Sequence, residues 1–376
     1  MAAPEFDAVI VGAGIAGASV AHALAPHARV LLLEREAQPG MHSTGRSAAM
    51  FMESYGPPQA RAITRASRAF YETPPPGFCD VPILAPRGVL YVAWQHQQAA
   101  LAALFDELVA TGAAVHRVGT DEALRQVPAL RADGLFGAIA EPQAMDIDVH
   151  ALHQGYLRGL RRHGGELLTD AELLRAEPRG GRWRIELADG RTLHARTLVD
   201  AAGAWADDVA RRCGARARGL QPKRRSAFTF APPPGVDARR WPTVADVGEA
   251  WYFKPDAAQL IGSPANADPV AAHDVVPEEI DIATGIAGIE AATTLTIRRP
   301  SRVWAGLRTF AADGELVIGW DPDRSAFFWL AGQGGYGIQS ADGAAQLAAA
   351  LWLGAPLPEG LRAQGVAAHA MDPGRL

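Results

Sequence analysis

The first 34 residues carry the clearest pattern of hydrophobic and polar positions in the chain. An apolar run at 8–11 is followed by a glycine-rich segment at 12–17, an apolar helical stretch, and a second apolar run at 30–33. Short apolar runs bounded by turn residues predict buried strands, and the longer stretch between them predicts a helix. The segment therefore predicts a strand, a tight turn, a helix and a second, parallel strand.

The remaining pattern predicts alternating helices and strands up to residue 205, and a different mix of elements after that. We expect helices over 59–72, 97–111, 120–127 and 148–163, and strands over 88–94, 166–176, 183–187 and 197–200. From 222 to 309 the pattern changes to short β-rich segments at 225–230, 250–254 and 260–262, separated by proline turns. Strands at 316–318 and 327–331 and an alanine-rich helix from residue 338 follow.

This order of elements predicts an α/β protein with a doubly wound, Rossmann-type dinucleotide-binding domain and an inserted, mainly antiparallel β-sheet domain. The first domain would comprise residues 1–50, 145–218 and 306–376. The second would comprise residues 51–144 and 219–305.

The glycine-rich turn has the spacing of a dinucleotide-binding motif. Gly12, Gly14 and Gly17 would let the backbone approach a pyrophosphate, whose charge is favoured at the N-terminus of the following helix. Glu34 ends the second strand, 22 residues after Gly12, where it could accept hydrogen bonds from ribose hydroxyls. The segment therefore predicts a bound dinucleotide.

A second glycine cluster, Gly332, Gly334 and Gly337, also lies between a strand and a helix. The chain after that helix has no further strand and no acid to bind a ribose, so a second dinucleotide site is not expected. The partial positive charge of a helix N-terminus would suit the N1–C2=O edge of a flavin, which becomes anionic on reduction.

Composition narrows the class of protein and its partners. The 376 residues have a net charge of −5, and the arginine pairs are scattered among acids, so nucleic acid is not an expected partner. The two cysteines and the remaining residues show no metal-ligand spacing. No apolar run is long enough to span a bilayer. Acids in place of a basic segment precede the first apolar run, so no targeting segment is expected. A cytoplasmic location is expected.

Five segments, at 10–17, 34–35, 43–49, 201–205 and 334–337, together resemble the D-amino-acid oxidase superfamily of FAD enzymes. The resemblance spans almost the whole chain. Within it, residues 152–159, 221–228, 262–269 and 294–300 are very similar to the bacterial D-arginine dehydrogenases. The resemblance implies an FAD-binding domain and a substrate domain. It also implies noncovalent FAD, because neither Cys79 nor Cys213 lies in a segment similar to the flavin attachment site of sarcosine-oxidase relatives.

The resemblance implies which residues surround the FAD. The glycines of the first turn would approach the pyrophosphate, Glu34 would bind the adenosine ribose, and the backbone near Leu173 would meet the adenine. The loop at 44–49 would lie along the flavin. The expected cofactor-binding residues are Gly12, Gly14, Ile15, Ala16, Gly17, Glu34, Arg35, Thr44, Gly45, Arg46, Ser47, Ala48, Ala49, Leu173, Ala202, Gly203, Trp205, Gly332, Gly334, Gly335, Tyr336, Gly337, Ile338 and Gln339.

The resemblance also implies the residues that bind the substrate. A substrate carboxylate requires fixed cations, and Arg308 matches the arginine that binds it in the family. One of Arg224 and Arg225 matches a second arginine, and because strand residues alternate faces only one of the two can face the substrate. Tyr252, Tyr336 and Tyr55 match tyrosines of the substrate site and its loop, and Met50, Met52 and Val89 would line the side-chain pocket.

The implied activity is the oxidative deamination of a D-amino acid, in which a hydride passes from Cα to flavin N5 and the imine hydrolyses to a 2-oxo acid and ammonia. A quinone, a dye or oxygen would accept the electrons. Val89 aligns with a glutamate that binds the guanidinium in the arginine-specific relatives, so apolar or broad specificity is expected, with Glu53 as an alternative carboxylate. A glycine- or sarcosine-type amine oxidase and a flavin-binding protein without turnover remain open.

Overall fold

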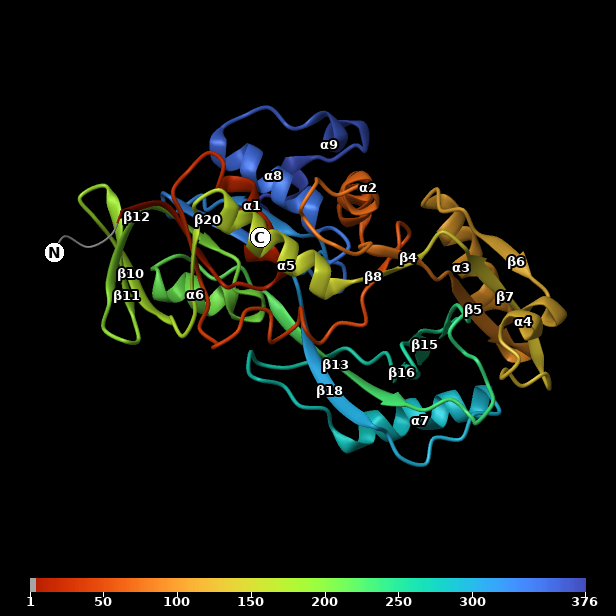
Figure 1. Cartoon of the computed structure of the whole chain (residues 1–376). Helices are drawn as coiled ribbons and strands as arrows, with labels where there is room; N and C mark the ends of the chain where they lie inside the picture. Colours follow the sequence, from red (N-terminus) through yellow and green to blue (C-terminus); the bar gives the residue numbers. More distant parts are fainter. Residues whose placement is uncertain (1–4) are drawn as a thin grey trace.

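The computed structural model describes residues 5–376 and shows two units, each built around a large sheet (Figure 1). The sheet of the first unit has eight strands, and its centre is parallel in the order β20, β12, β1, β2, β9. β19 pairs antiparallel with β20, and the β10–β11 ribbon extends antiparallel from β12. The strands are β1 (Glu5–Val11), β2 (Val30–Leu33), β9 (Glu166–Leu168), β10 (Leu173–Arg179), β11 (Arg182–Leu187), β12 (Thr192–Asp200), β19 (Val317–Trp320) and β20 (Phe327–Ala331).

Both faces of this sheet are buried. Ala8 and Ile10 of β1 face one core, which is covered by helices α1 (Ile15–Leu24), α5 (Val149–Arg162) and α8 (Ala341–Leu353). Val9 and Val11 face the opposite core, which is shared with β10, β11 and α6 (Ala206–Arg212). A central parallel strand that alternates between two apolar layers is typical of a doubly wound α/β domain. The predicted fold class is therefore confirmed.

Helix α2 (Pro58–Glu72) packs against α8 and α9 (Glu359–Ala363), and its residues Ile63 and Tyr71 belong to the same core as α1. This segment was assigned to the inserted domain on the basis of the sequence. Its packing favours placing it with the first unit, and the exact division into domains stays a proposal.

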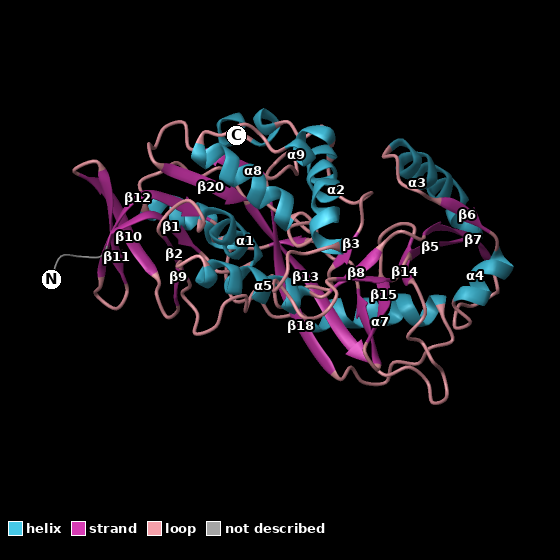
Figure 2. Cartoon of the chain, turned by 45° about the horizontal axis from the view of Figure 1, so that its top comes forward, coloured by secondary structure: helices cyan, strands magenta, loops and turns pink. Residues whose placement is uncertain are grey.

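The second unit is built on a nine-stranded sheet that is mostly antiparallel (Figure 2). Its path is β17, β13, β16, β15, β14, β5, β7, β6, with β18 on the other side of β13. Its helices are α3 (Gln98–Ala110), α4 (Thr120–Gln126) and α7 (Glu279–Ala292). The strands are β5 (Val89–Trp94), β6 (His116–Val118), β7 (Leu135–Glu141), β13 (Gln221–Phe230), β14 (Thr243–Asp246), β15 (Tyr252–Asp256), β16 (Gln259–Ser263), β17 (Asp268–Pro269) and β18 (Arg302–Phe310).

Two further features connect the units. β13 and β18 form a long antiparallel pair, from Gln221 opposite Phe310 to Thr229 opposite Arg302, and this pair extends from the first unit into the second (Figure 1). A small sheet of β3 (Met50–Phe51), β8 (Met145–Ile147) and β4 (Leu84–Pro86) contacts the second unit through the ion pair of Asp146 on β8 with Lys254 on β15. No helix among residues 5–376 has both the length and the apolar character needed to cross a membrane.

Several elements differ from the sequence-based expectation. The strand expected over 166–176 is divided into β9 and β10, because Asp170 adopts a left-handed conformation (φ +50°) and the Ala171 amide bonds to the Glu34 carbonyl. Helix α7 lies in a stretch that was expected to be β-rich. Helix α8 begins at Ala341 instead of residue 338, so residues 338–340 separate the expected loop at 332–337 from the helix.

Candidate active site

The turn between β1 and α1 is closed by backbone contacts that leave no room for side chains. Gly12 has φ +97°, and a Cβ added there would lie 2.7 Å from the Ala201 carbonyl oxygen. A Cβ added to Gly17 would lie 1.8 Å from the carbonyl oxygen of Gly12. Gly14 is the N-cap of α1 and borders a long cavity, so the positive end of the helix faces the place where an anion is favoured.

Glu34 lies at the end of β2, beside this turn. Its two carboxylate oxygens accept hydrogen bonds from the amides of Ala13 and Glu36, each at 3.0 Å. The side chain is largely buried and borders the cavity. Each oxygen keeps a lone pair for a further donor, such as a ribose hydroxyl.

His153 holds the turn from the side of α5. Its Nε2 donates to the Ala13 carbonyl oxygen at 2.9 Å. Burial lowers the pKa of the ring, so His153 is neutral at physiological pH and its Nε2 carries the proton. His153 is therefore a positioning residue for the turn.

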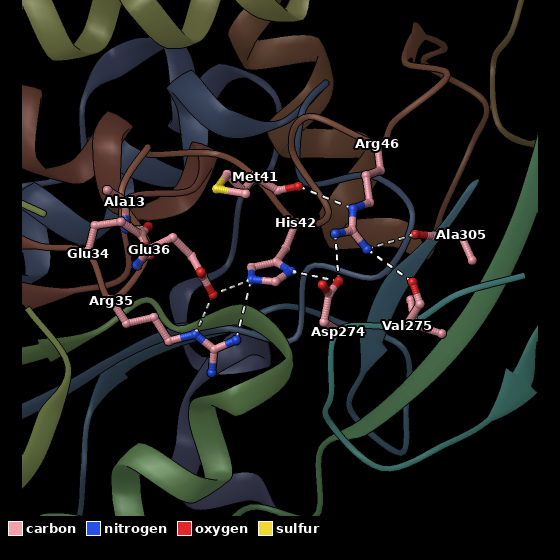
Figure 3. A network of polar contacts seen from close by, with 10 residues as sticks. All are labelled: Ala13, Glu34, Arg35, Glu36, Met41, His42, Arg46, Asp274, Val275 and Ala305. Carbon is pink, nitrogen blue, oxygen red and sulfur yellow. Dashed lines mark hydrogen bonds and ion pairs between the residues drawn. The ribbon is translucent and has the colours of Figure 1, made fainter. Parts of the chain in front are cut away.

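The loop that follows β2 runs along the cavity and is fastened to the second unit (Figure 3). The Ser43 hydroxyl donates to the Leu307 carbonyl at 2.6 Å, and the Thr44 hydroxyl accepts from the Ile15 amide at 2.9 Å. The guanidinium of Arg46 donates to Asp274 at 2.6 Å and to two backbone carbonyls near it. The loop is thereby fixed between the two sheets.

His42 extends this contact between the units (Figure 3). Its Nε2 lies 2.8 Å from Glu36 and its Nδ1 lies 3.7 Å from Asp274. The hydrogen bond from His42 lowers the pKa of Glu36. The Arg35 guanidinium lies 3.9 Å from the centre of the Trp205 ring, and both residues border the cavity.

The cavity has about 1650 Å³ of empty space, including its open mouth, and runs from Glu34 to Arg308. Most of the predicted cofactor-binding residues line it: Gly12, Gly14, Ile15, Ala16, Glu34, Arg35, Thr44, Arg46, Ser47, Ala48, Leu173, Ala202, Gly203, Trp205, Gly332, Gly334, Gly335, Gly337 and Ile338. Gly17, Gly45, Ala49, Tyr336 and Gln339 do not line it.

Gln339 and Tyr336 instead support the loop beside the cavity. The Gln339 amide bonds to the backbone of Met52 and Tyr55, and so it fixes the course of residues 52–55. The Tyr336 hydroxyl donates to the Gly314 carbonyl, and the ring is buried under Tyr55. The structure shows packing contacts for Tyr336, and the substrate contact expected from the sequence stays a prediction.

Two arginines face the cavity side by side. Arg225 on β13 and Arg308 on β18 lie on the same face of the sheet. Arg308 is directly opposite Lys223, and Arg225 follows Lys223 by two residues on β13, so all three side chains point to one face. Among residues 5–376, neither has a carboxylate within ion-pair distance; Arg225 donates to the Asn266 carbonyl, and Arg308 lies 3.4 Å from the Tyr55 hydroxyl. Burial and the charge of Arg308 lower the pKa of Arg225 to about 10.

Arg224 faces the other way. It forms ion pairs with Glu278 and with Asp281, the latter with Nε and Oδ2 3.0 Å apart. The alternation of strand residues left the choice between Arg224 and Arg225 open, and the structure selects Arg225.

The remaining predicted substrate residues are distributed differently. Tyr252 lines the cavity. The Met50 sulfur accepts from the Thr243 hydroxyl at 2.9 Å, and Met52 is half-buried in the same loop. Val89 is buried and borders a separate surface cleft. Its role in specificity, like those of Met50 and Met52, stays a prediction.

Gln333 was not singled out from the sequence. It lies between two of the loop glycines and borders the cavity, and its buried Nε2 has no hydrogen-bond partner within the described part of the chain. A buried, unpaired donor is costly unless a ligand satisfies it. Its place inside the second glycine cluster is the only sequence signal that could have drawn attention to it.

The family described as FAD dependent oxidoreductase matches residues 7–351, and the chain belongs to this family. The glycine oxidase of Bacillus licheniformis is 23% identical over 94% of this chain and 94% of its own length. The L-2-hydroxyglutarate dehydrogenase of Salmonella houtenae is 27% identical over 56% of this chain and 50% of its own length. The crystal structure of L-proline dehydrogenase from P. horikoshii has a TM-score of 0.84 at 18% identity, covering 100% of this chain and 98% of that one.

The cofactor of this protein is FAD, and the described residues fit it. The helix N-terminus at Gly14 suits the pyrophosphate, Glu34 suits the ribose, and the unpaired amide of Gln333 suits a carbonyl or ring nitrogen of the flavin. Bound there, FAD would supply the acceptor for a hydride. The arginine pair at the far end of the cavity would hold an anionic substrate beside it.

We expect the FAD to be released when the protein is denatured. Neither cysteine borders the cavity, and burial raises the pKa of both thiols, so neither is placed or activated for attachment. Acid precipitation of the purified protein should leave a yellow supernatant and a colourless pellet. A flavin that remains with the pellet would contradict this prediction.

Proposed function

We propose that the protein is an FAD-dependent D-amino-acid dehydrogenase that converts a D-amino acid to a 2-oxo acid and ammonia. The pair of Arg225 and Arg308, which faces the cavity and has no carboxylate partner in the described part of the chain, carries the proposal. Two adjacent guanidinium groups attract an anion and can hold a carboxylate in a fixed orientation. Similar proteins are named for glycine, L-2-hydroxyglutarate and L-proline, and each of these compounds carries such a carboxylate.

The residues of the chain would orient the substrate more than they would react with it. Arg308 and Arg225 would bind the carboxylate, and the hydroxyls of Tyr252 and Tyr55 would border it. With Cα held in place, the lone pair of a neutral amine assists departure of the hydride. Water then adds to the imine, which releases ammonia and leaves the 2-oxo acid. This sequence requires no general base from the protein.

Several finer points belong to the same proposal. The four segments that are similar to bacterial D-arginine dehydrogenases support a relationship of this chain to those enzymes. Apolar or broad specificity follows from Val89 in place of a glutamate. Cys79 and Cys213 are free thiols, which fits a reducing cytoplasm. The electron acceptor would be a quinone, a dye or oxygen.

Anaerobic mixing of the flavin-loaded protein with D-amino acids tests the proposal. We expect D-methionine and D-leucine to bleach the visible absorption band of the flavin, because each presents a carboxylate to the arginine pair and a hydride at Cα. The L-enantiomers are the control and should leave the band unchanged. A band that no D-amino acid bleaches would refute the proposed function.

A glycine- or sarcosine-type amine oxidase is the second candidate. The similarity to a glycine oxidase over 94% of this chain favours it. The same measurement separates the two, because a glycine-type enzyme is bleached faster by glycine or sarcosine than by D-leucine. A protein bleached by none of these compounds would be a flavin-binding protein without this turnover.

A further inference from the structure

The face of the nine-stranded sheet that carries Tyr252 continues away from the arginine pair. Tyr252 on β15 is opposite Ala245 on β14, and Ala245 is beside Tyr91 on β5. Directly paired residues point to the same face, so Tyr91 shares the sheet face on which Tyr252 lines the cavity. The two residues are two strand spacings apart, about 10 Å. The order of β15, β14 and β5 is visible in Figure 2.

A buried carboxyl lies at the Tyr91 end of this face. Glu141 ends β7 directly opposite Val89, so its side chain points to the same face as Val89 and Tyr91. Its carboxylate accepts from the Ser54 hydroxyl, 2.9 Å from each oxygen, and from the Tyr91 hydroxyl at 3.3 Å. Only 3% of the residue is exposed, whereas Tyr91 is half-buried. Ser54 directly precedes Tyr55, whose hydroxyl meets Arg308.

Glu141 has no cation as a partner among residues 5–376. Arg68 pairs with Glu53 at 2.6 Å, which also removes Glu53 as a free carboxylate for a substrate. Lys254 and Arg87 both pair with Asp146, at 2.5 and 2.6 Å. A buried carboxylate without a cationic partner is unfavourable unless a charge is supplied from outside.

The site therefore has two poles of opposite sign. Within residues 5–376, two arginines without carboxylate partners lie at one end and a carboxyl without a cation lies at the other. Two consecutive residues connect them, because the Tyr55 hydroxyl meets Arg308 and the Ser54 hydroxyl meets Glu141. We propose that Glu141, with Tyr91 and Ser54, is the specificity-determining group for D-amino acids whose long side chain ends in a cationic donor. The inference rests on the proposed function, in which Arg308 and Arg225 hold the carboxylate.

This arrangement also explains how one pocket takes different side chains. A short or apolar side chain ends before it reaches Glu141, so Glu141 keeps its hydrogen bonds from the hydroxyls of Tyr91 and Ser54 and gains no new partner. A guanidinium or ammonium on a chain of three or four carbons reaches further and replaces lost hydration with a charge-assisted hydrogen bond. Val89 contributes no charge, and the carboxyl directly across the sheet from it provides one.

The test compares the wild type with Glu141→Gln, which keeps the size and the acceptor but removes the charge. The ratio of kcat/KM for D-arginine to that for D-methionine should fall at least about 10-fold, because a charge-assisted bond is lost for only one substrate. Glu122→Gln, which makes the same change on the exposed surface of α4, should leave the ratio unchanged. An equal fall for both substrates would mean that Glu141 only supports the loop, and would overturn the inference.

A binding measurement keeps the inference separate from the proposed reaction. The ligand is δ-guanidinovalerate, which is D-arginine without its amino group, and its control is the isostere in which an isobutyl group replaces the guanidino group. In calorimetric titration, the flavin-loaded wild type should bind the guanidino acid at least about 10-fold more tightly than the control. Glu141→Gln should abolish this preference. Equal binding of the two acids by the wild type would overturn the inference even if D-amino acids are oxidised. A clear preference without any oxidation would refute only the proposed function.

The pH dependence gives a readout that a purely structural role would not move. Burial raises the pKa of Glu141, and Glu53 in the adjoining loop acts in the same direction, whereas the Ser54 and Tyr91 hydroxyls oppose it. The neutral form of Glu141 therefore persists to a higher pH than for an exposed glutamate, and its charge is present only above the raised pKa. The preference for the guanidino acid should fall as the pH is lowered in the wild type, and should be small and flat in Glu141→Gln.

Discussion

Replacement of Arg308 by alanine is expected to lower kcat/KM for every accepted amino acid by at least about 100-fold. The guanidinium borders the cavity, and within residues 5–376 its only hydrogen-bond partner is the Tyr55 hydroxyl, at 3.4 Å, so it is available to a substrate carboxylate. Removing one charge-assisted pair in a partly buried site costs about 3 kcal/mol of transition-state stabilisation. Steady-state kinetics on flavin-loaded protein measures the effect.

Arg302→Ala is the matched control for this variant. Arg302 lies on the same strand, β18, but is exposed to solvent, so its removal should change kcat/KM by less than about 2-fold. If Arg308→Ala is folded, loaded with FAD and kinetically normal, Arg308 does not bind the carboxylate. The proposal would then depend on Arg225 alone.

Gly17→Ala is expected to weaken FAD binding at least about 10-fold. The added Cβ would lie 1.8 Å from the Gly12 carbonyl oxygen, which is backbone and can move only if the turn opens. An open turn displaces the N-terminus of α1 from the pyrophosphate. The amount of FAD per chain after gel filtration, read from the visible spectrum, measures the loss.

The control for Gly17→Ala is Gly360→Ala in helix α9, where an added Cβ meets no atom within 4 Å. It should retain full FAD and unfold at or slightly above the wild-type temperature, since alanine favours a helix. Full retention of FAD by Gly17→Ala would show that the turn tolerates a side chain. The close contact between Gly17 and Gly12 would then have no role in holding the cofactor.

The parts of the fold that could be predicted from the sequence are those set by local spacing. The turn at 12–17 and the position of Glu34 depend on residues within one βαβ unit, and the family and structural comparisons agree with FAD as the cofactor. Helix α7 was missed although its signal is local. Ile282, Gly285, Ile289 and Ala292 are buried at helical spacing, and two acids lie in its first turn.

The parts that could not be predicted depend on register between distant strands. Whether Arg224 or Arg225 faces the cavity depends on how β13 aligns with β18, some 80 residues later in the chain. Nothing in the sequence singled out Glu141, because its proposed role depends on its position opposite Val89 and on its hydrogen bond with Ser54. Spacing along the chain contains no information of this kind.

The separation of the two poles on one sheet has a consequence for how such an enzyme can change. The carboxylate anchors lie on β13 and β18, while Glu141 and Tyr91 lie on β7 and β5, with three strands between the two pairs. Substitutions on β5 and β7 can therefore alter which side chains are accepted while the anchors and the FAD turn keep their positions. A new substrate range is then accessible by single steps that each leave a working catalyst, which makes β5 and β7 the strands to randomise in directed evolution.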